Sequence, residues 1–362
     1  MQVANKYIFQ VKPYVPGKPI EDVKRELGLK SVIKLASNEN SYPPSKKVLA
    51  AMTSAIKGVN RYPDGGCVVL RKALAKFLKV AEDQLIFGNG SDEIIVLAVK
   101  AFVGKGDEVI IAQPSFLIYD IASRLAGAKI HSVPLKNFKY DLASMKAKIS
   151  RRTKIIFIGN PDNPSGTYIN LKEAEDLIKA ASKDTLVFFD EAYFEYVHSK
   201  DYPDGIALMK KYPNVLVTRT FSKMYGLAGL RVGYGIGRAD IIDILNRLRE
   251  PFNVNSVAQV AAVAALGDQA YYKNVAAKVE EQRQFLYRSL TGLNLAYVNS
   301  FTNFILIYVG GDSTALAQAL LKQGVIIRDM SAWGLKGYIR VSIGTGQENK
   351  RFIQTLTKMV EA

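Results

Sequence analysis

Short apolar runs alternate with amphipathic stretches over most of the chain. Residues 108–112 (EVIIA), 155–158 (IIFI) and 186–189 (LVFF) include continuous apolar runs, which are typical of strands buried on both faces. Stretches with a helical spacing of apolar residues lie between them, for example residues 91–103 and 171–183. Strands and helices in this order predict an α/β fold, in which helices cover both faces of a mostly parallel sheet.

The pattern changes near both ends of the chain. Residues 1–30 contain prolines that keep an arm out of helix, and the arm is followed by one short helical stretch. Beyond Pro251 come long Ala-rich helices and then a further alternation of strands and helices. At 362 residues the chain is long enough for two domains. We therefore predict a large domain over residues 31–250 and a smaller α/β domain that combines the arm with residues 251–362.

Polar and glycine-rich turns follow several of the predicted strands. In open parallel sheets ligands bind beyond the carboxyl ends of the strands, so residues at these ends are candidates for a site. Such residues are Asn89–Asp92, Phe116, Asn163 and Asp190. The glycine turn 88–90 opens a helix, whose unpaired N–H groups and dipole suit a phosphate. Plain N-capping by Ser91 or Asp92 is the simpler explanation of that turn taken alone.

One lysine, Lys223, lies between a Ser/Thr/Arg-rich approach and a run of spaced glycines in residues 218–235. The preceding residues 214–221 (NVLVTRTF) predict a short buried strand, which places Lys223 near a strand end. A desolvated lysine beside another positive group loses its proton more easily and can form a Schiff base. The chain has 49 Lys and Arg residues, so any one of them taken alone is more simply a solvated surface charge.

Composition narrows the class of protein. A hydrophobic content of 48% and a charged content of 23% are ordinary for a soluble globular protein, and no apolar run approaches the ~18 residues of a membrane span. The N-terminal stretch has no apolar segment with a cleavage site, so we expect no secretory signal and a cytoplasmic location. With Cys67 as the single cysteine and only His131 and His198 as histidines, we expect no disulfide within the chain and no metal site.

The formal net charge of +16 raises the question of a nucleic-acid partner, because basic domains neutralise phosphates. Here the basic residues are spread along the chain, and no helix-turn-helix, zinc-finger or RNP pattern is present. We therefore expect no nucleic-acid partner and assign the charge to the attraction of small anionic ligands or to solubility.

Several motifs, taken together and in order, resemble those of fold-type I pyridoxal-phosphate enzymes, the aspartate-aminotransferase-like class. They are GNGSDE, QPSF, NPDNPSG, DEAY and TFSKMYGLAGLRVGY. Within that class, KLASNENSYPPS, RYP, GVIIRDM and GYIRVSIGT look most like the histidinol-phosphate aminotransferase family. The resemblance covers nearly the whole chain. It implies a large cofactor-binding domain with a mostly parallel sheet and a smaller C-terminal α/β domain.

The resemblance also implies a cofactor, pyridoxal 5'-phosphate, which serves as an electron sink. Lys223 would hold it as a Schiff base and, once displaced by the substrate amine, would act as the general base. Asp190 would pair with the pyridine nitrogen and keep it protonated. Asn163 and Tyr193 would hydrogen-bond the phenolic oxygen of the ring. Phe116 would stack on the ring at a position where many relatives carry tyrosine.

The cofactor phosphate would sit in a cup of backbone amides, hydroxyls and a guanidinium, which binds phosphate in a bidentate way. This cup would consist of the backbone amides of Ser91 and Asp92 and the side chains of Thr220, Ser222 and Arg231. Tyr62 resembles the tyrosine that reaches the same phosphate from the neighbouring subunit. The resemblance therefore implies a homodimer with shared sites.

Arg340, Arg328 and Asn40 are the candidates for binding substrate. Arg340 lies where the class binds the α-carboxylate of amino- and keto-acid substrates, and Arg328 matches a position associated with the phosphate of histidinol phosphate. Asn40, with Glu39, would lie near the substrate side chain. The implied reaction is reversible amino transfer between L-histidinol phosphate and 2-oxoglutarate, giving imidazole-acetol phosphate and glutamate, in histidine biosynthesis. An aromatic amino acid aminotransferase and a pyridoxal-phosphate-dependent threonine-phosphate decarboxylase stay open as alternatives.

Overall fold

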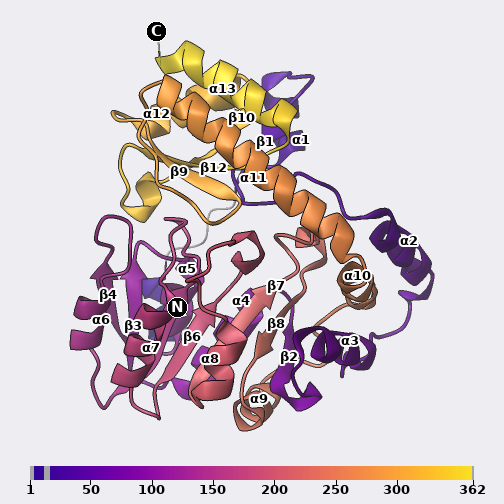
Figure 1. Cartoon of the computed structure of the whole chain (residues 1–362), viewed down its shortest axis with the longest axis vertical. Coiled ribbons are helices and arrows are strands. Elements are labelled where there is room, and N and C mark those ends of the chain that lie inside the picture. The colour runs from indigo at the N-terminus through magenta and orange to yellow at the C-terminus, as the bar shows by residue number, and fades with distance from the viewer. Residues whose placement is uncertain (1–3, 12–16, 361–362) are drawn as a thin grey trace.

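A seven-stranded sheet forms the centre of the larger part of the molecule in the computed structural model (Figure 1). The structure describes residues 4–11 and 17–360. The strand order is β2-β8-β7-β6-β5-β3-β4, and β8 alone in this sheet runs antiparallel to its neighbours. The strands are β2 (Leu85–Gly88), β3 (Glu108–Gln113), β4 (Lys129–Pro134), β5 (Thr153–Gly159), β6 (Leu186–Asp190), β7 (Val215–Thr220) and β8 (Gly233–Ile236). The predicted α/β class with a mostly parallel sheet is confirmed.

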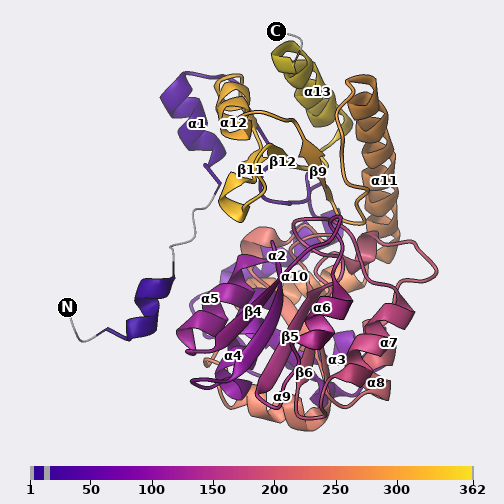
Figure 2. The same cartoon turned by 90° about the vertical axis from the view of Figure 1, so that its left-hand side faces the viewer.

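Alternate residues of these strands face two different cores. Val109 and Ile111 pack on the side of one set of helices, while Ile110 and Ala112 pack into a larger core on the other side. The first set is α4 (Ser91–Phe102), α5 (Leu117–Leu125) and α9 (Ala239–Asn246); the other side includes α3 (Val68–Leu78), α6 (Leu142–Ala147), α7 (Leu171–Ala180) and α8 (Gly205–Lys211). Figure 2 shows α4 and α5 on one side of the sheet and α6, α7 and α8 on the other. Because the strands are buried on both faces, their sequences are continuous apolar runs.

Two smaller sheets lie at the opposite end of the molecule (Figure 1). One is antiparallel with the order β11-β12-β9, and the other pairs β1 with β10 in parallel. Their strands are β1 (Ile33–Lys34), β9 (Phe304–Tyr308), β10 (Val325–Ile326), β11 (Arg328–Asp329) and β12 (Tyr338–Ser342), accompanied by α1 (Ile20–Leu27), α12 (Ser313–Lys322) and α13 (Gly346–Val360). Residues from both ends of the chain thus share one sheet, while the domain boundaries given above stay a prediction.

The N-terminal arm is more helical than its prolines predict. Its described residues form a 3-10 helix, η1 (Lys6–Gln10), and α1, which ends at Gly28 with a φ of 64°. A left-handed glycine is a common helix terminator, so this end agrees with the sequence. The predicted extended stretch around Pro13 and Pro16 lies outside the described residues.

The helices α2 (Lys46–Ala55), α10 (Ser256–Leu266) and α11 (Gln269–Gly292) complete the described elements of eight or more residues. Helix α11 runs from α10, beside the large sheet, to the small sheets (Figure 1). With 24 residues it spans about 36 Å and reaches both parts of the molecule. Among residues 4–11 and 17–360, neither this helix nor any other is apolar and long enough to qualify as a membrane span.

Candidate active site

All but two of the predicted site residues line a single pocket with a volume of about 330 Å³. The residues that the structure brings together are Ser91, Asp92, Phe116, Asn163, Asp190, Tyr193, Thr220, Ser222, Lys223, Arg231, Arg328 and Arg340. They come from the carboxyl ends of β3, β5, β6 and β7, from the start of α4, from the turn before β8 (Arg231) and from β11 and β12 of the small sheet. The expectation that polar residues after successive strands converge at one edge of the sheet is confirmed.

The N-terminus of α4 forms one wall of the pocket. Its N-cap is Gly90, with a φ of 81° and no side-chain capping bond, so the plain N-capping that Ser91 or Asp92 could provide does not occur. A Cβ atom at Gly90 would lie 2.2 Å from a guanidinium nitrogen of Arg231, which explains why glycine is needed here. The first-turn N–H groups of Ser91 and Asp92 therefore lack a capping side chain, and they sit beside a cation.

Arg231 is fixed over this helix end. Its Nη1 donates to Ser222 Oγ and to the Ala228 carbonyl, each at 3.3 Å, and its Nη2 donates to Asp92 Oδ2 at 3.3 Å. Thr220 Oγ1 accepts a bond of 3.1 Å from the Ser222 backbone N–H, which orders the same turn. An uncapped helix N-terminus, hydroxyls and a guanidinium together fit a phosphate group.

Asp190 ends β6 with its carboxylate buried in the pocket wall. Tyr119 donates to Oδ2 at 2.7 Å, while the Thr218 hydroxyl at 3.4 Å and the Ala192 backbone N–H at 3.3 Å donate to Oδ1. Burial raises the pKa of Asp190 to about 6, against the lowering effect of the Tyr119 hydrogen bond. Because these donors are neutral, a ligand that brings a positive charge, such as a protonated pyridine nitrogen, fits this carboxylate.

Lys223 follows β7 and extends into the pocket. Its Nζ lies 5.7 Å from the centre of the Tyr193 ring. Desolvation lowers the pKa of Lys223 to about 8, and the positive charge of Arg340 adds to this effect. An amine with this pKa is unprotonated more often at neutral pH than a surface lysine, and it can therefore act as a nucleophile or a base.

Asn163 and Tyr193 connect the large sheet to residues of the small one. Asn163 Oδ1 accepts a hydrogen bond of 2.5 Å from Arg340 Nη1, and Tyr193 Oη accepts one of 3.0 Å from Asn38 Nδ2. Burial raises the pKa of Tyr193 to about 12, so its hydroxyl stays protonated at neutral pH. Polar groups at this junction come from both parts of the molecule, and the pocket therefore depends on how the two parts meet.

Aromatic and cationic side chains also line or border the pocket. Phe116 meets Tyr119 edge to face, with ring centres 5.6 Å apart, and Tyr119 stacks on Phe157 at 4.6 Å. Arg328 and Arg340 occupy paired positions of the antiparallel strands β11 and β12. Arg328 also lies over the Trp333 ring, with its guanidinium carbon 5.5 Å from the ring centre. Two guanidiniums on neighbouring strands suit a substrate that carries more than one negative charge.

Tyr62 and Asn40 lie outside this pocket. Tyr62 is 83% exposed and stacks on Phe252, with ring centres 4.7 Å apart. Asn40 donates to the Met224 carbonyl at 2.8 Å and accepts from the Tyr42 backbone N–H at 3.0 Å, so its side chain holds a turn. The roles predicted for these two residues find no support within a single chain, and that of Tyr62 requires a neighbouring subunit.

The sequence interpretation missed Asn38, Tyr119 and Trp333, which also line the pocket. Asn38 belongs to the same polar turn as Asn40, and nothing in the local pattern says which of the two side chains points inward. Tyr119 lies three positions after Phe116, a spacing that places both on one face of a helix and could have drawn attention to it. Trp333 is the chain's single tryptophan, but a lone aromatic residue does not by itself indicate a binding site.

Comparison with known proteins gives a family match and full-length relatives. The model of the family described as aminotransferase class I and II matches residues 30–356. The chain is 45% identical to the histidinol-phosphate aminotransferase of Moorella thermoacetica, over 98% of this chain and 92% of that protein. It is 44% identical to the histidinol-phosphate aminotransferase of an Anaeromyxobacter species, over 100% of both chains.

Solved structures give the same picture. The histidinol-phosphate aminotransferase of Sinorhizobium meliloti, in complex with pyridoxal-5'-phosphate, is similar with a TM-score of 0.91 and 28% identity, covering 100% of this chain and 98% of that one. An aspartate aminotransferase of Thermus thermophilus, solved with maleate, has a TM-score of 0.85 and 22% identity over 100% of both chains. At that identity the second likeness concerns the fold alone.

Proposed function

The chain belongs to the aminotransferase class I and II family, and from this premise we propose that it transfers an amino group between L-histidinol phosphate and 2-oxoglutarate in histidine biosynthesis. It is a fold-type I enzyme whose cofactor is pyridoxal 5'-phosphate. Full-length relatives that carry the name histidinol-phosphate aminotransferase support the substrate. The observation that carries the proposal is one pocket that holds Lys223 and Asp190 next to the paired arginines Arg328 and Arg340.

The residues around the pocket fit the cofactor group by group. The uncapped start of α4 with Arg231 and Ser222 would hold the phosphate, and the buried Asp190 would face the ring nitrogen. Asn163 and Tyr193 would meet the phenolic oxygen of the ring. When bound, pyridoxal phosphate supplies an electron sink that stabilises negative charge at the substrate carbon next to the amine.

The protein residues would then handle the proton and the charges. Lys223 would hold the cofactor covalently and, once released by the substrate amine, would move the proton at the α-carbon of the substrate. A pKa of about 8 leaves part of its amine unprotonated at neutral pH, which suits a base. Asp190 would stay ionised opposite a positive ring nitrogen, because a nearby opposite charge favours the charged form.

The arginines would account for the use of two different substrates. Histidinol phosphate carries a phosphate, and 2-oxoglutarate carries two carboxylates. Arg340 would bind the α-carboxylate of the keto acid, and Arg328 would bind the phosphate of histidinol phosphate. Phe116 would stack on the pyridine ring of the cofactor, and Trp333, which also lines the pocket, would border the imidazole ring.

A second copy of the chain would complete the site. Apolar side chains are exposed on α2, on α3 and on the segment between them, among them Val59 at 59%, Tyr62 at 83% and Val69 at 70%. Single exposed apolar residues are ordinary, but a group of them on adjacent elements is typical of an interaction surface. We propose that this surface forms a homodimer in the cytoplasm, in which Tyr62 reaches the phosphate cup of the partner subunit.

The test is a half-reaction. The purified holoenzyme receives L-histidinol phosphate without a keto acid, and the absorbance of the bound cofactor and the formation of imidazole-acetol phosphate are followed. We expect one equivalent of product per site, turnover with formation of glutamate once 2-oxoglutarate is added, and no product from a Lys223→Ala variant.

The same assay separates the alternatives. Conversion of phenylalanine or tyrosine but not of histidinol phosphate would overturn the proposal in favour of an aromatic amino acid aminotransferase. Carbon dioxide released from threonine phosphate would indicate a decarboxylase instead. Sedimentation of the wild type and of a Tyr62→Ala variant, with activity measured in parallel, tests the dimer and the shared site separately.

A further inference from the structure

Asn38 is held in an unusual backbone conformation at the junction of the two parts of the molecule. Its φ is 53°, in the left-handed region that few residues other than glycine adopt, although asparagine tolerates it better than most. Its backbone N–H donates to Ser342 Oγ at 2.8 Å, and its carbonyl accepts a bond of 3.0 Å from Asn303 Nδ2. The side chain is buried. These contacts, from the end of β12 and from the loop before β9, keep Asn38 in one position.

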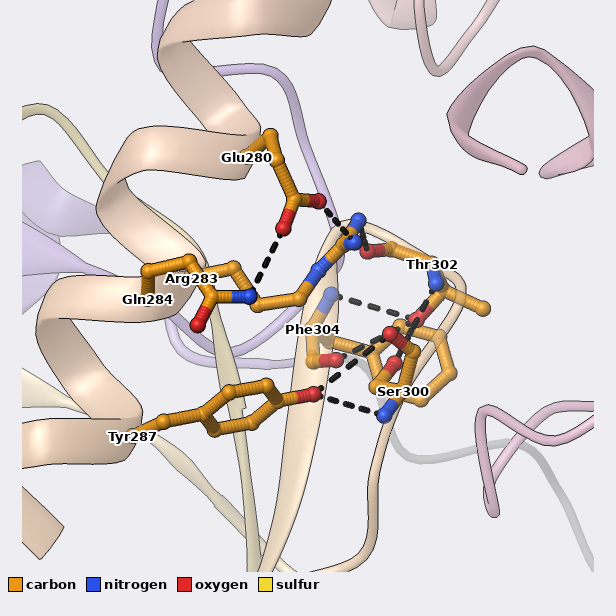
Figure 3. Close-up of polar contacts among 7 residues, drawn as sticks. All are labelled: Glu280, Arg283, Gln284, Tyr287, Ser300, Thr302 and Phe304. Carbon is orange, nitrogen blue, oxygen red and sulfur yellow. Dashed lines mark hydrogen bonds and ion pairs between the residues drawn. The ribbon is translucent and has the colours of Figure 1, made fainter. Parts of the chain in front are cut away.

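The loop before β9 is itself fixed by helix α11, as Figure 3 shows. Tyr287 Oη accepts a bond of 2.7 Å from the Ser300 backbone N–H, and Arg283 Nη2 donates to the Thr302 carbonyl at 2.8 Å. The loop then carries Asn303, which binds Asn38, and leads into Phe304. Helix α11 therefore supports the partner that holds Asn38.

The same segment also positions Tyr193. The ring of Phe304, the first residue of β9, meets the Tyr193 ring edge to face with centres 5.3 Å apart. Arg340 lies over the Phe304 ring, with its guanidinium carbon 5.2 Å from the ring centre. Two consecutive residues, Asn303 before β9 and Phe304 at its start, thus hold the Asn38 backbone and the Tyr193 ring, so the distance between the Asn38 and Tyr193 side chains is set by rigid contacts.

The hydrogen bond between the side chains of Asn38 and Tyr193 has a defined donor and a defined acceptor. Asn38 Nδ2 lies 3.0 Å from Tyr193 Oη and donates to it. An amide NH₂ group can only donate, so the phenol oxygen acts as the acceptor and its own hydrogen remains for another partner. Tyr193 stays protonated at neutral pH, because burial raises its pKa to about 12. A protonated phenol that accepts on one side is a donor on the other, toward the pocket that it lines.

We propose that Asn38 is a positioning residue that directs the hydroxyl hydrogen of Tyr193 toward the phenolic oxygen of the bound cofactor. This inference rests on the proposed function, since it takes from it the contact between Tyr193 and the ring oxygen. Asn38 acts through Tyr193 and need not touch the substrate. A hydrogen bond donated to the ring oxygen favours its negative form, and it therefore lowers the pH at which the bound cofactor titrates.

The test uses variants that separate shape from hydrogen-bond direction. Asn38→Asp keeps the size of the side chain but replaces the donor by an acceptor, which would draw the Tyr193 hydrogen away from the ring. Asn38→Gly removes the amide while it tolerates the positive φ. Tyr193→Phe removes the hydroxyl. Asn294→Gly is the matched control, because Asn294 also has a positive φ, of 54°, and is not among the residues that line the pocket.

Two measurements on these variants need no turnover: the midpoint of the pH titration of the cofactor's visible absorbance, and the dissociation constant of the apoenzyme for pyridoxal phosphate. We expect Asn38→Asp and Tyr193→Phe each to raise the midpoint by about one pH unit or more. Asn38→Gly should raise it less, and Asn294→Gly should leave it unchanged. The double variant Asn38→Gly/Tyr193→Phe should shift no further than Tyr193→Phe alone, because both changes remove one interaction and neither adds a charge.

Other results would overturn the inference. If Tyr193→Phe moves the midpoint and Asn38→Asp does not, or if the shifts of Asn38→Gly and Tyr193→Phe add in the double variant, Asn38 does not act through the Tyr193 hydroxyl. If Asn38→Asp fails to fold, as judged by circular dichroism, the comparison of Asn38→Gly with Asn294→Gly decides in the same way. Failure of the proposed function looks different, because the wild type itself would then bind no pyridoxal phosphate or would not convert histidinol phosphate.

Discussion

Two buried carboxylates lie at opposite ends of the strands of the large sheet, and they differ in the charge of the groups around them. Glu108 begins β3 at the amino-terminal edge, and Asp190 ends β6 at the carboxyl-terminal edge. Glu108 is surrounded by donors and cations from the starts of neighbouring strands: Ser150 Oγ at 2.6 Å, Arg152 Nη2 at 3.1 Å, His131 Nε2 at 3.2 Å and Lys129 Nζ at 3.3 Å. Asp190 receives its hydrogen bonds from Tyr119, Thr218 and a backbone N–H, all neutral.

The difference appears in the acidity of the two groups. The hydrogen bond from Ser150, with that from Lys129, outweighs burial and lowers the pKa of Glu108 to about 2. Burial dominates at Asp190 and raises its pKa to about 6. A carboxylate whose charge is already compensated contributes to the stability of the sheet. A buried carboxylate without a cation costs stability, and such a cost is typical of a site that a ligand completes.

The largest expected effect comes from Asp190→Asn. The amide keeps the shape but cannot offer a negative charge to the ring nitrogen, so we expect kcat/KM for histidinol phosphate to fall about 100- to 1000-fold. Thermal unfolding of the apoenzyme should show no loss of stability. A variant that is inactive because it is unfolded would contradict this reading, which makes the apoenzyme melting curve the control.

The pH dependence of stability tests the same carboxylate. The folded pKa of Asp190, about 6, exceeds its ordinary value of 3.8, so the cost of its charge is fully present above pH 6 and disappears as the pH falls toward 4. A shift of this size corresponds to about 3 kcal/mol. Urea unfolding of the apoenzyme should therefore show Asp190→Asn more stable than the wild type at pH 7, and the two nearly equal at pH 4. Equal stability at pH 7 would mean that the charge of Asp190 is compensated.

Glu108→Gln should show the opposite behaviour. We expect a loss of about 1–3 kcal/mol at pH 7, because hydrogen bonds to a charged group are lost, while kcat changes less than twofold. The folded pKa of Glu108, about 2, lies below its ordinary 4.5, so its stabilisation is fully present above pH 4.5 and is lost as the pH falls toward 2. Urea unfolding at several pH values measures the first effect, and steady-state kinetics measures the second. A tenfold loss of kcat would show that the two edges are coupled.

The smallest expected effect in free energy is that of Tyr119→Phe. The change removes the hydrogen bond to Asp190 Oδ2 but keeps the ring that stacks on Phe157. Without this donor the pKa of Asp190 should rise further, and we expect a loss of kcat/KM of about tenfold or less. The dissociation constant for pyridoxal phosphate should rise more at pH 6 than at pH 8, because the Asp190 carboxylate is protonated more often at pH 6. An affinity loss that does not vary with pH would assign Tyr119 a packing role alone.

Much of this protein could be read from local sequence. The apolar runs predicted the buried strands, and their alternation with amphipathic stretches predicted the α/β class, because burial on two faces leaves a direct mark on the pattern. Parallel strands point the same way, so the residues that follow them, among them Ser91, Asn163 and Asp190, had to meet at the carboxyl ends of the strands. Lys223 and Arg231 belong to a motif long enough to resemble a family.

Only the tertiary structure decided the rest. It placed Asn38 in the pocket and left Asn40 outside, it aimed Tyr119 at Asp190, and it set Arg328 across from Arg340. Within an irregular turn the direction of a side chain depends on φ and ψ, which neighbouring residues do not determine. The backbone of Asn38 is held in its left-handed conformation by Asn303 and Ser342, which lie 265 and 304 positions away in the chain. Contacts between such distant residues form only when the chain has folded, so a local pattern carries no trace of them.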